Sequence, residues 1–125
     1  MDRTIVIRVG GIVLEAILND SNTANTIWDA LPVEAHANTW GDEIYFAIPV
    51  EVELEQGQDI VKIGDLGYWP VGKAFCIFFG LTPMSSGNEI RPASAVNVFG
   101  KILGDATVLR EISSGTEIFV DKKGN

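Results

Sequence analysis

Cysteine and histidine are nearly absent from this sequence of 125 residues, which contains one of each, Cys76 and His36. A single cysteine cannot form an internal disulfide, and one histidine with one cysteine in an apolar run is too few for a zinc site. No nucleophile motif such as G-x-S-x-G accompanies His36. There is also no P-loop, and no G-x-G-x-x-G follows a predicted strand. We therefore expect neither a metal nor a cofactor.

Basic residues and long apolar runs are also scarce. Nine Lys and Arg stand against 17 Asp and Glu, for a net charge of −8. This balance disfavours nucleic acid as a partner, because affinity for phosphate backbones comes mainly from Lys and Arg. No apolar stretch approaches the ~20 residues that cross a bilayer, and the N-terminus lacks the pattern of a signal peptide. We expect a cytoplasmic protein that binds neither nucleic acid nor membrane.

The densest apolar stretch, GYWPVGKAFCIFFG, covers residues 67–80. Its second half, residues 74–79, is a continuous apolar run that ends at Gly80, which is typical of a strand buried on both faces. Its first half is broken by Gly and Pro, so we expect Tyr68 and Trp69 to lie at the surface beside a ligand. Aromatic rings there offer rigid contact area with polar tips.

Short strands with frequent turns occupy most of the rest. Residues 4–9 and 12–18 alternate and are joined by Gly10-Gly11, a hairpin signal. One amphipathic helix is expected, with Ala24, Ile27 and Trp28 in its apolar stripe and Pro32 ending it. Further strands are expected over residues 34–39, 43–54, 95–102 and 116–120. The pattern predicts one all-β domain, 1–125, forming a closed barrel of about eight strands capped by one short helix.

Alternation over residues 43–54 puts Ile44 and Phe46 on one face and Glu43 and Tyr45 on the other. Pro49 requires an edge or a bulge near the middle of this strand. Glu51, Glu53 and Glu55 follow on the second face, where they form either a solvated surface or a site for a hard cation such as Ca²⁺. The spacing favours the solvated surface.

Three stretches resemble the cyclophilins: residues 13–32, 74–80 (AFCIFFG) and 98–112 (VFGKILGDATVLREI), the last being the most specific. Taken whole, the chain resembles a compact prokaryotic branch called cyclophilin-like, over nearly all of its length. The resemblance implies an eight-stranded barrel with capping helices and, in cyclophilins proper, isomerisation of X-Pro bonds.

In cyclophilins an arginine presses on the prolyl amide and a glutamine helps to hold the substrate. The matching positions here are Phe46 (Tyr45 if the register shifts by one) for the arginine and Ile77 for the glutamine. None of these side chains supplies the polar group. The resemblance therefore implies the fold without efficient prolyl isomerase activity.

A cleft is predicted from aromatic and charged residues near these strands, and its partner is expected to be a small molecule or a short peptide. The alternatives are a satellite core for Tyr68 and Trp69, a structural ion pair for Arg91, and a solvated strand face for Glu43. Two other functions stay open: a prolyl isomerase with an altered site using Arg91 as donor, and an accessory subunit of an amide-hydrolysing assembly such as oxoprolinase. The predicted ligand-binding residues are Trp40, Glu43, Tyr45, Tyr68, Trp69 and Arg91.

Overall fold

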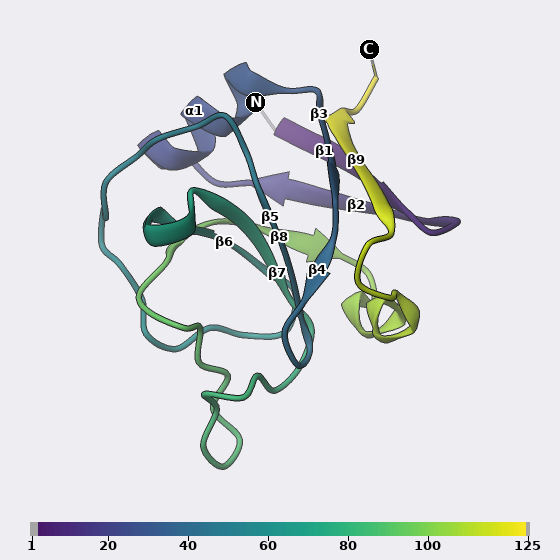
Figure 1. Ribbon diagram of the computed structural model, residues 1–125. Helices are drawn as coiled ribbons and strands as arrows, with labels where there is room; N and C mark the ends of the chain where they lie inside the picture. The colour runs from purple at the N-terminus through teal and green to yellow at the C-terminus, as the bar shows by residue number, and fades with distance from the viewer. Residues whose placement is uncertain (1–2, 125) are drawn as a thin grey trace.

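The computed structural model describes residues 3–124, which form nine strands, one α-helix and two 3₁₀-helices (Figure 1). The predicted all-β fold is confirmed, with nine strands in place of about eight. The helix is nine residues long, and no helix in the described part of the chain has the length and hydropathy to cross a membrane. The elements are β1 (Arg3–Val9), β2 (Ile12–Leu18), α1 (Asn22–Ala30), β3 (Val33–His36), β4 (Asn38–Thr39), β5 (Glu43–Ala47), β6 (Asp65–Trp69), η1 (Pro70–Gly72), β7 (Ala74–Phe78), β8 (Asn97–Leu103), η2 (Ala106–Glu111) and β9 (Glu117–Lys122).

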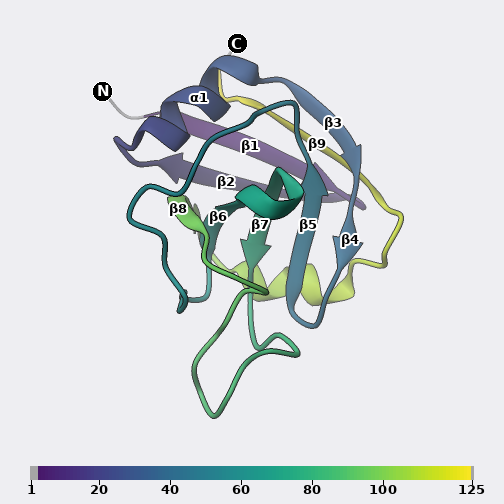
Figure 2. The ribbon, with the colours of Figure 1, turned by 60° about the vertical axis from the view of Figure 1, so that its left-hand side comes forward.

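The strands form one antiparallel sheet in the order β3-β9-β1-β2-β8-β6-β7-β5-β4. Its two outermost strands, β3 and β4, are neighbours in the chain and are separated only by Ala37. The two ends of the sheet therefore meet in a single extended segment, and the sheet rolls up into a nearly closed barrel (Figure 2). The predicted hairpin at Gly10-Gly11 is confirmed, since both glycines have positive φ angles (54° and 84°) and join β1 to β2.

The predicted helix is also confirmed. The side chain of Ser21 accepts a hydrogen bond of 3.1 Å from the backbone N–H of Ala24, which caps the N-terminus of α1. Ala24 and Ile27 are buried, and Trp28 packs against the barrel core from its rim. The ammonium group of Lys122 lies 4.9 Å from the centroid of the Trp28 ring.

Large side chains fill the barrel interior. Phe46 stacks on Phe75 with ring centroids 4.9 Å apart, and Phe75 meets Phe99 edge to face at 5.0 Å. Tyr68 is also fully buried among these residues, and its hydroxyl donates a 2.6 Å hydrogen bond to the carbonyl oxygen of Val50. The expectation that Tyr68 lies at the surface is wrong, because Gly67 and Tyr68 continue strand β6 and Tyr68 points inward.

The long strand predicted over residues 43–54 is shorter in the structure. Only β5 pairs with its neighbours, and the chain then leaves the sheet as an irregular segment, residues 48–64, which we call the strap. Pro49 has no N–H to donate to a ladder, which explains why pairing stops beside it. Ile48 and Val50 nevertheless stay buried against the core. The alternation of the sequence therefore predicted the buried side chains correctly, although these residues do not form a strand.

Buried polar contacts hold the strap to the barrel. Asn97 accepts a 2.7 Å hydrogen bond from the backbone N–H of Glu55 and donates to the Thr23 hydroxyl and the Glu53 carbonyl. One carboxylate oxygen of Glu55 in turn accepts from both the N–H and the hydroxyl of Thr23 at the start of α1. These hydrogen bonds lower the pKa of Glu55 below its ordinary value.

Strand β7 is buried on both faces, as predicted, because a second apolar layer covers the outside of the barrel there. Phe75 and Ile77 face the barrel core, whereas Cys76 and Phe78 face a smaller cluster outside it. Val61 of the strap and Ile90 and Val96 of the loop before β8 complete this cluster. Figure 2 shows the strap in teal and the 80–96 loop in green; neither is part of the sheet. The candidate site lies in this outer layer.

Candidate functional site

A cavity of about 200 Å³ lies on the outer face of strands β5, β7 and β6. Strand pairing aligns its floor, since Tyr45 of β5 lies opposite Cys76 of β7, and Cys76 in turn lies opposite Gly67 of β6. Gly67 leaves room for the side chain of Val96, because a Cβ atom on Gly67 would lie 2.9 Å from a Val96 side-chain carbon. The lining residues are Trp40, Glu43, Tyr45, Trp69, Cys76, Pro92, Ala93 and Val96.

Two hydrogen bonds set the walls of this cavity. The backbone N–H of Trp40 donates to the carbonyl oxygen of Glu43 at 2.9 Å, which closes the turn between β4 and β5. The indole N–H of Trp69 donates to the hydroxyl of Ser94 at 2.6 Å, which ties the 80–96 loop to the end of β6. The first bond fixes one aromatic wall, and the second holds the loop over the opening.

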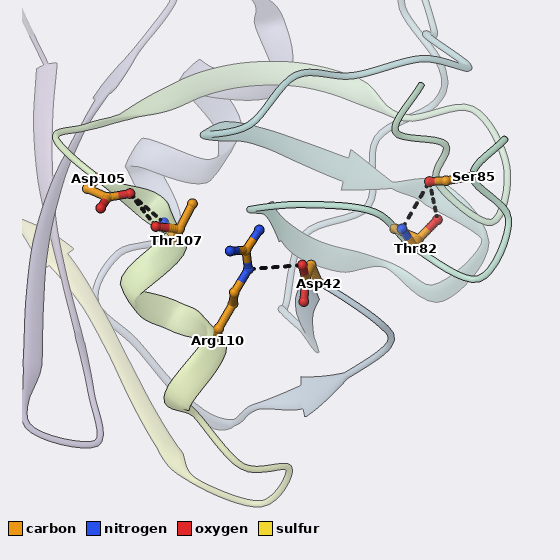
Figure 3. A network of polar contacts seen from close by, with 6 residues as sticks. All are labelled: Asp42, Thr82, Ser85, Asp105, Thr107 and Arg110. Atoms are coloured by element: carbon orange, nitrogen blue, oxygen red, sulfur yellow. Dashed lines mark hydrogen bonds and ion pairs between the residues drawn. The ribbon is translucent and has the colours of Figure 1, made fainter. Parts of the chain in front are cut away.

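The base of the 80–96 loop is closed by a small polar cluster next to the cavity. The hydroxyl of Ser85 accepts hydrogen bonds from the backbone N–H groups of Thr82 (2.9 Å) and Arg91 (3.1 Å). The Thr82 hydroxyl donates to the Arg91 carbonyl. Figure 3 shows the contact between Thr82 and Ser85. These bonds fix the chain just before Pro92, which forms part of the cavity wall.

A second contact in Figure 3 supports the turn that carries Glu43. The guanidinium of Arg110 in η2 donates a 3.1 Å hydrogen bond to the carboxylate of Asp42. Figure 3 also shows Asp105, whose carboxylate accepts from Thr107 and caps η2. Asp42 exchanges backbone hydrogen bonds of 2.9 Å with Phe79 and Leu81. Asp42, the residue before Glu43, is therefore held by the segment that follows β7 and by η2.

Glu43 is the unusual member of this site. Its side chain sits in an apolar surrounding with only 5 % of the residue exposed, and its Oε1 has no hydrogen-bond partner. Burial raises the pKa of its carboxyl group from 4.5 to about 7, and the neighbouring Cys76 thiol opposes part of that rise. A buried polar oxygen without a partner is costly to the folded protein. It therefore calls for an explanation beyond stability.

Cys76 faces Glu43 across the floor. Burial, together with the neighbouring carboxyl group, raises the pKa of its thiol well above the ordinary value. A nucleophilic cysteine needs a lowered pKa, since the thiolate is the reactive form. The pair therefore provides a neutral thiol beside a carboxyl group whose pKa lies near 7. This arrangement is suited to recognising a polar group and not to thiolate chemistry.

Four of the six predicted ligand-binding residues, Trp40, Glu43, Tyr45 and Trp69, line this one cavity. Tyr68 faces the barrel core instead. The guanidinium of Arg91 lies 3.1 Å from the Glu89 carboxylate and is not part of the lining, although Arg91 directly precedes Pro92. The lining residues that the sequence did not single out are Cys76, Pro92, Ala93 and Val96.

The positions that correspond to the isomerase residues lie elsewhere. Phe46 and Ile77 are both buried inside the barrel, at 1 % and 0 % exposure. Tyr45, the alternative position for the arginine, does face the cavity, but it carries no positive charge. The catalytic arginine of cyclophilins therefore has no counterpart at any of these positions.

His36 and the row of Glu51, Glu53 and Glu55, which the sequence analysis also considered, lie away from this cavity. His36 borders a wide, polar groove along β1, β3 and β9 together with Arg8, Glu34 and Glu117. Within residues 3–124, no group of three or more His, Cys, Asp or Glu side chains is arranged to hold a metal ion. In particular, the Glu55 carboxylate is engaged by Thr23 at the start of α1.

The fold and the site define a nearly closed β-barrel domain with a small cavity on the outside of its sheet. The family model described as "Cyclophilin-like" matches residues 3–121, so the chain belongs to the cyclophilin-like family. This confirms the family resemblance stated from the sequence. The chain is also similar to the hypothetical protein AF2241 from Archaeoglobus fulgidus, known from a solution structure: 42 % identity, a TM-score of 0.81, and coverage of 97 % of this chain and 95 % of that one. No curated protein matches the chain.

Proposed function

We propose that this cyclophilin-like barrel binds a small organic molecule in the cavity lined by Trp40, Glu43, Tyr45 and Trp69, without efficient prolyl isomerase activity. The observation that carries the proposal is the carboxyl group of Glu43, a buried residue in the lining of an aromatic-walled cavity, which has one oxygen without a hydrogen-bond partner. Apolar walls with a few convergent polar groups are typical of ligand sites. A ligand that donates a hydrogen bond to the Glu43 carboxyl group supplies a partner that the protein itself does not provide.

The size of the cavity narrows the ligand class. Sites for drug-sized ligands usually measure about 300–1,000 Å³, whereas an apolar cavity of about 150 Å³ holds benzene. At about 200 Å³ this cavity suits one aromatic ring with a short polar substituent. The volume favours a small molecule over a peptide, of which only one side chain would enter.

The test uses benzyl alcohol, a neutral probe of this size, and isothermal titration calorimetry. Ala93 lines the cavity but is itself exposed, so the substitution Ala93→Phe blocks the site without overpacking the core. The matched control is Val71→Phe, at a position of η1 that is 76 % exposed and outside the cavity. We expect saturable binding to the wild type and to Val71→Phe and none to Ala93→Phe. Equal binding to all three proteins would refute the proposed site.

The proposed lack of efficient prolyl isomerase activity is tested separately. A protease-coupled assay on Ala-Pro peptides should give the uncatalysed rate, because the proposed cavity holds no Arg or Lys to donate toward the prolyl nitrogen. A rate well above the uncatalysed one that falls to background in Arg91→Ala would favour the altered isomerase instead.

A further inference from the structure

The chemistry of the cavity points to the charge of its ligand. We propose that the site selects a small organic cation, an aromatic ammonium such as benzylammonium, with the charged nitrogen at Glu43 and the ring against Trp40, Tyr45 and Trp69. This inference rests on the proposed function, since it requires that the cavity binds a ligand. It adds the sign of the ligand's charge and names Glu43 as the group that recognises that charge.

The polar group of the cavity favours a positively charged donor. A carboxylate accepts hydrogen bonds and carries negative charge, so the Glu43 carboxyl group, one oxygen of which has no partner, is matched by an N–H donor and best by a positively charged one. The eight lining residues include no Lys, Arg or His to neutralise it. A carboxylate left without a counter-ion in an apolar cavity is best stabilised by a cation that the ligand brings.

The aromatic side chains of the cavity also favour a cation. Three of the eight lining residues are Trp or Tyr, and all three are partly exposed beside the buried carboxyl group. The faces of such rings attract cations, and aromatic cages of this kind recognise ammonium ligands. A neutral ligand gains the apolar contact alone, whereas an ammonium gains both the ring faces and the carboxylate.

The net charge of the whole protein acts in the same direction. A net charge of −8 on 125 residues attracts cations toward the surface and repels anions. The nearest basic side chain in the loop, Arg91, is paired with Glu89 at 3.1 Å and lies outside the lining. An anionic ligand therefore meets repulsion both at long range and at Glu43.

Binding of a cation should be linked to the protonation of Glu43. The titratable groups that face Glu43 are Tyr45 on its own strand and Cys76 on β7; β6 and the 80–96 loop contribute Trp69, Pro92, Ala93 and Val96. Burial keeps the Cys76 thiol neutral near pH 7, so Glu43 is the group that changes charge there. A ligand that requires the carboxylate should bind about tenfold more tightly at about pH 8 than at about pH 6, since the pKa lies near 7.

The experiment compares benzylammonium, benzyl alcohol and benzoate by calorimetry at about pH 6 and about pH 8. These probes share one ring and differ in charge. We expect benzylammonium to bind most tightly at the higher pH and to lose about tenfold at the lower pH. Benzyl alcohol should bind more weakly with no pH dependence, and benzoate should not bind at the higher pH.

Substitution of Glu43 separates the effect of its charge from the effect of its shape. Glu43→Gln keeps the size of the side chain and should weaken benzylammonium binding at about pH 8 by about tenfold or more, with benzyl alcohol nearly unchanged. The control Glu111→Gln removes an equal charge from an exposed position on η2 and should leave both affinities unchanged. The pH dependence of the wild type tests the same point without any substitution.

The outcomes distinguish the two proposals. If benzyl alcohol binds as tightly as benzylammonium at both pH values, the cavity is a ligand site but the inference about charge is overturned. If no probe binds the wild type, the proposed function fails and the inference fails with it. Tight, pH-linked binding of benzylammonium that depends on Glu43 supports both.

Discussion

Replacement of Glu43 by Gln should stabilise the protein above neutral pH. The carboxyl group lies in an apolar cavity with one oxygen unpaired, so its charged form is disfavoured in the folded state. Glutamine has nearly the same shape and carries no charge. A residue whose removal stabilises the fold is typical of a functional site, where activity is kept at the expense of stability.

The size and sign of the effect follow from the pKa. Below about pH 4.5 the carboxyl group is protonated in both the folded and the unfolded protein, and it adds no pH dependence. As the pH rises from about 4.5 to about 7, the unfolded chain releases the proton while the folded protein retains it, so stability falls. Since a pKa difference of one unit corresponds to about 1.4 kcal/mol, the loss approaches about 3 kcal/mol above pH 7. That is a large share of the ~5–15 kcal/mol by which a domain is usually stable.

The assay is urea unfolding of the wild type and of Glu43→Gln at several pH values between about 4 and about 8. All other titrating groups are common to both proteins and cancel in the difference between their free energies of unfolding. We expect that difference to shift in favour of Glu43→Gln by about 3 kcal/mol over the range, and Glu111→Gln to show no such shift. A difference that stays constant with pH would show that Glu43 titrates as an ordinary exposed carboxyl group, and the account of the cavity would fall.

Three further predictions concern the frame of the site. Asn97→Ala removes one accepted and two donated hydrogen bonds that hold the strap, and should lower the free energy of unfolding by about 3 kcal/mol in urea titrations, against almost nothing for the exposed control Asn88→Ala. Trp69→Phe removes the hydrogen bond to Ser94, so amide hydrogen exchange over residues 94–96 should become faster while that of β1 stays unchanged. Gly100→Ala would place a Cβ atom 2.6 Å from the Ile17 carbonyl oxygen in the neighbouring strand and should destabilise the barrel by more than about 2 kcal/mol; near-wild-type stability would contradict the tight β2–β8 contact.

The barrel and its helix could be predicted from the sequence because their signals are local. Gly10-Gly11 specifies a hairpin, and the spacing of Ala24, Ile27 and Trp28 specifies a helix. The end of β5 at Ala47 was missed, because the alternation continues through Ile48 and Val50 while strand pairing does not. Periodicity reports which face is buried, and it does not report whether a neighbouring strand is present.

The site was predicted only in part, for a related reason. A continuous apolar run such as β7 gives no sign of which face meets which layer, so the sequence did not single out Cys76, which lies beside Glu43. Tyr68 was misplaced because the adjacent glycine resembles a turn, although Gly67 lies within β6, where a Cβ atom would crowd the side chains of Val96 and Phe78. Pro92 and Ala93 reach the cavity through the fold of a long loop, which no local pattern specifies.

The most direct test of the central claim is a map of amide chemical-shift changes in the ¹⁵N-labelled protein on titration with benzylammonium at about pH 8. The account predicts that the largest changes fall on residues 40–45, 67–69, 76 and 93–96, which surround the cavity. Changes concentrated instead along the groove of Arg8, His36 and Glu117, or no changes at all, would contradict it.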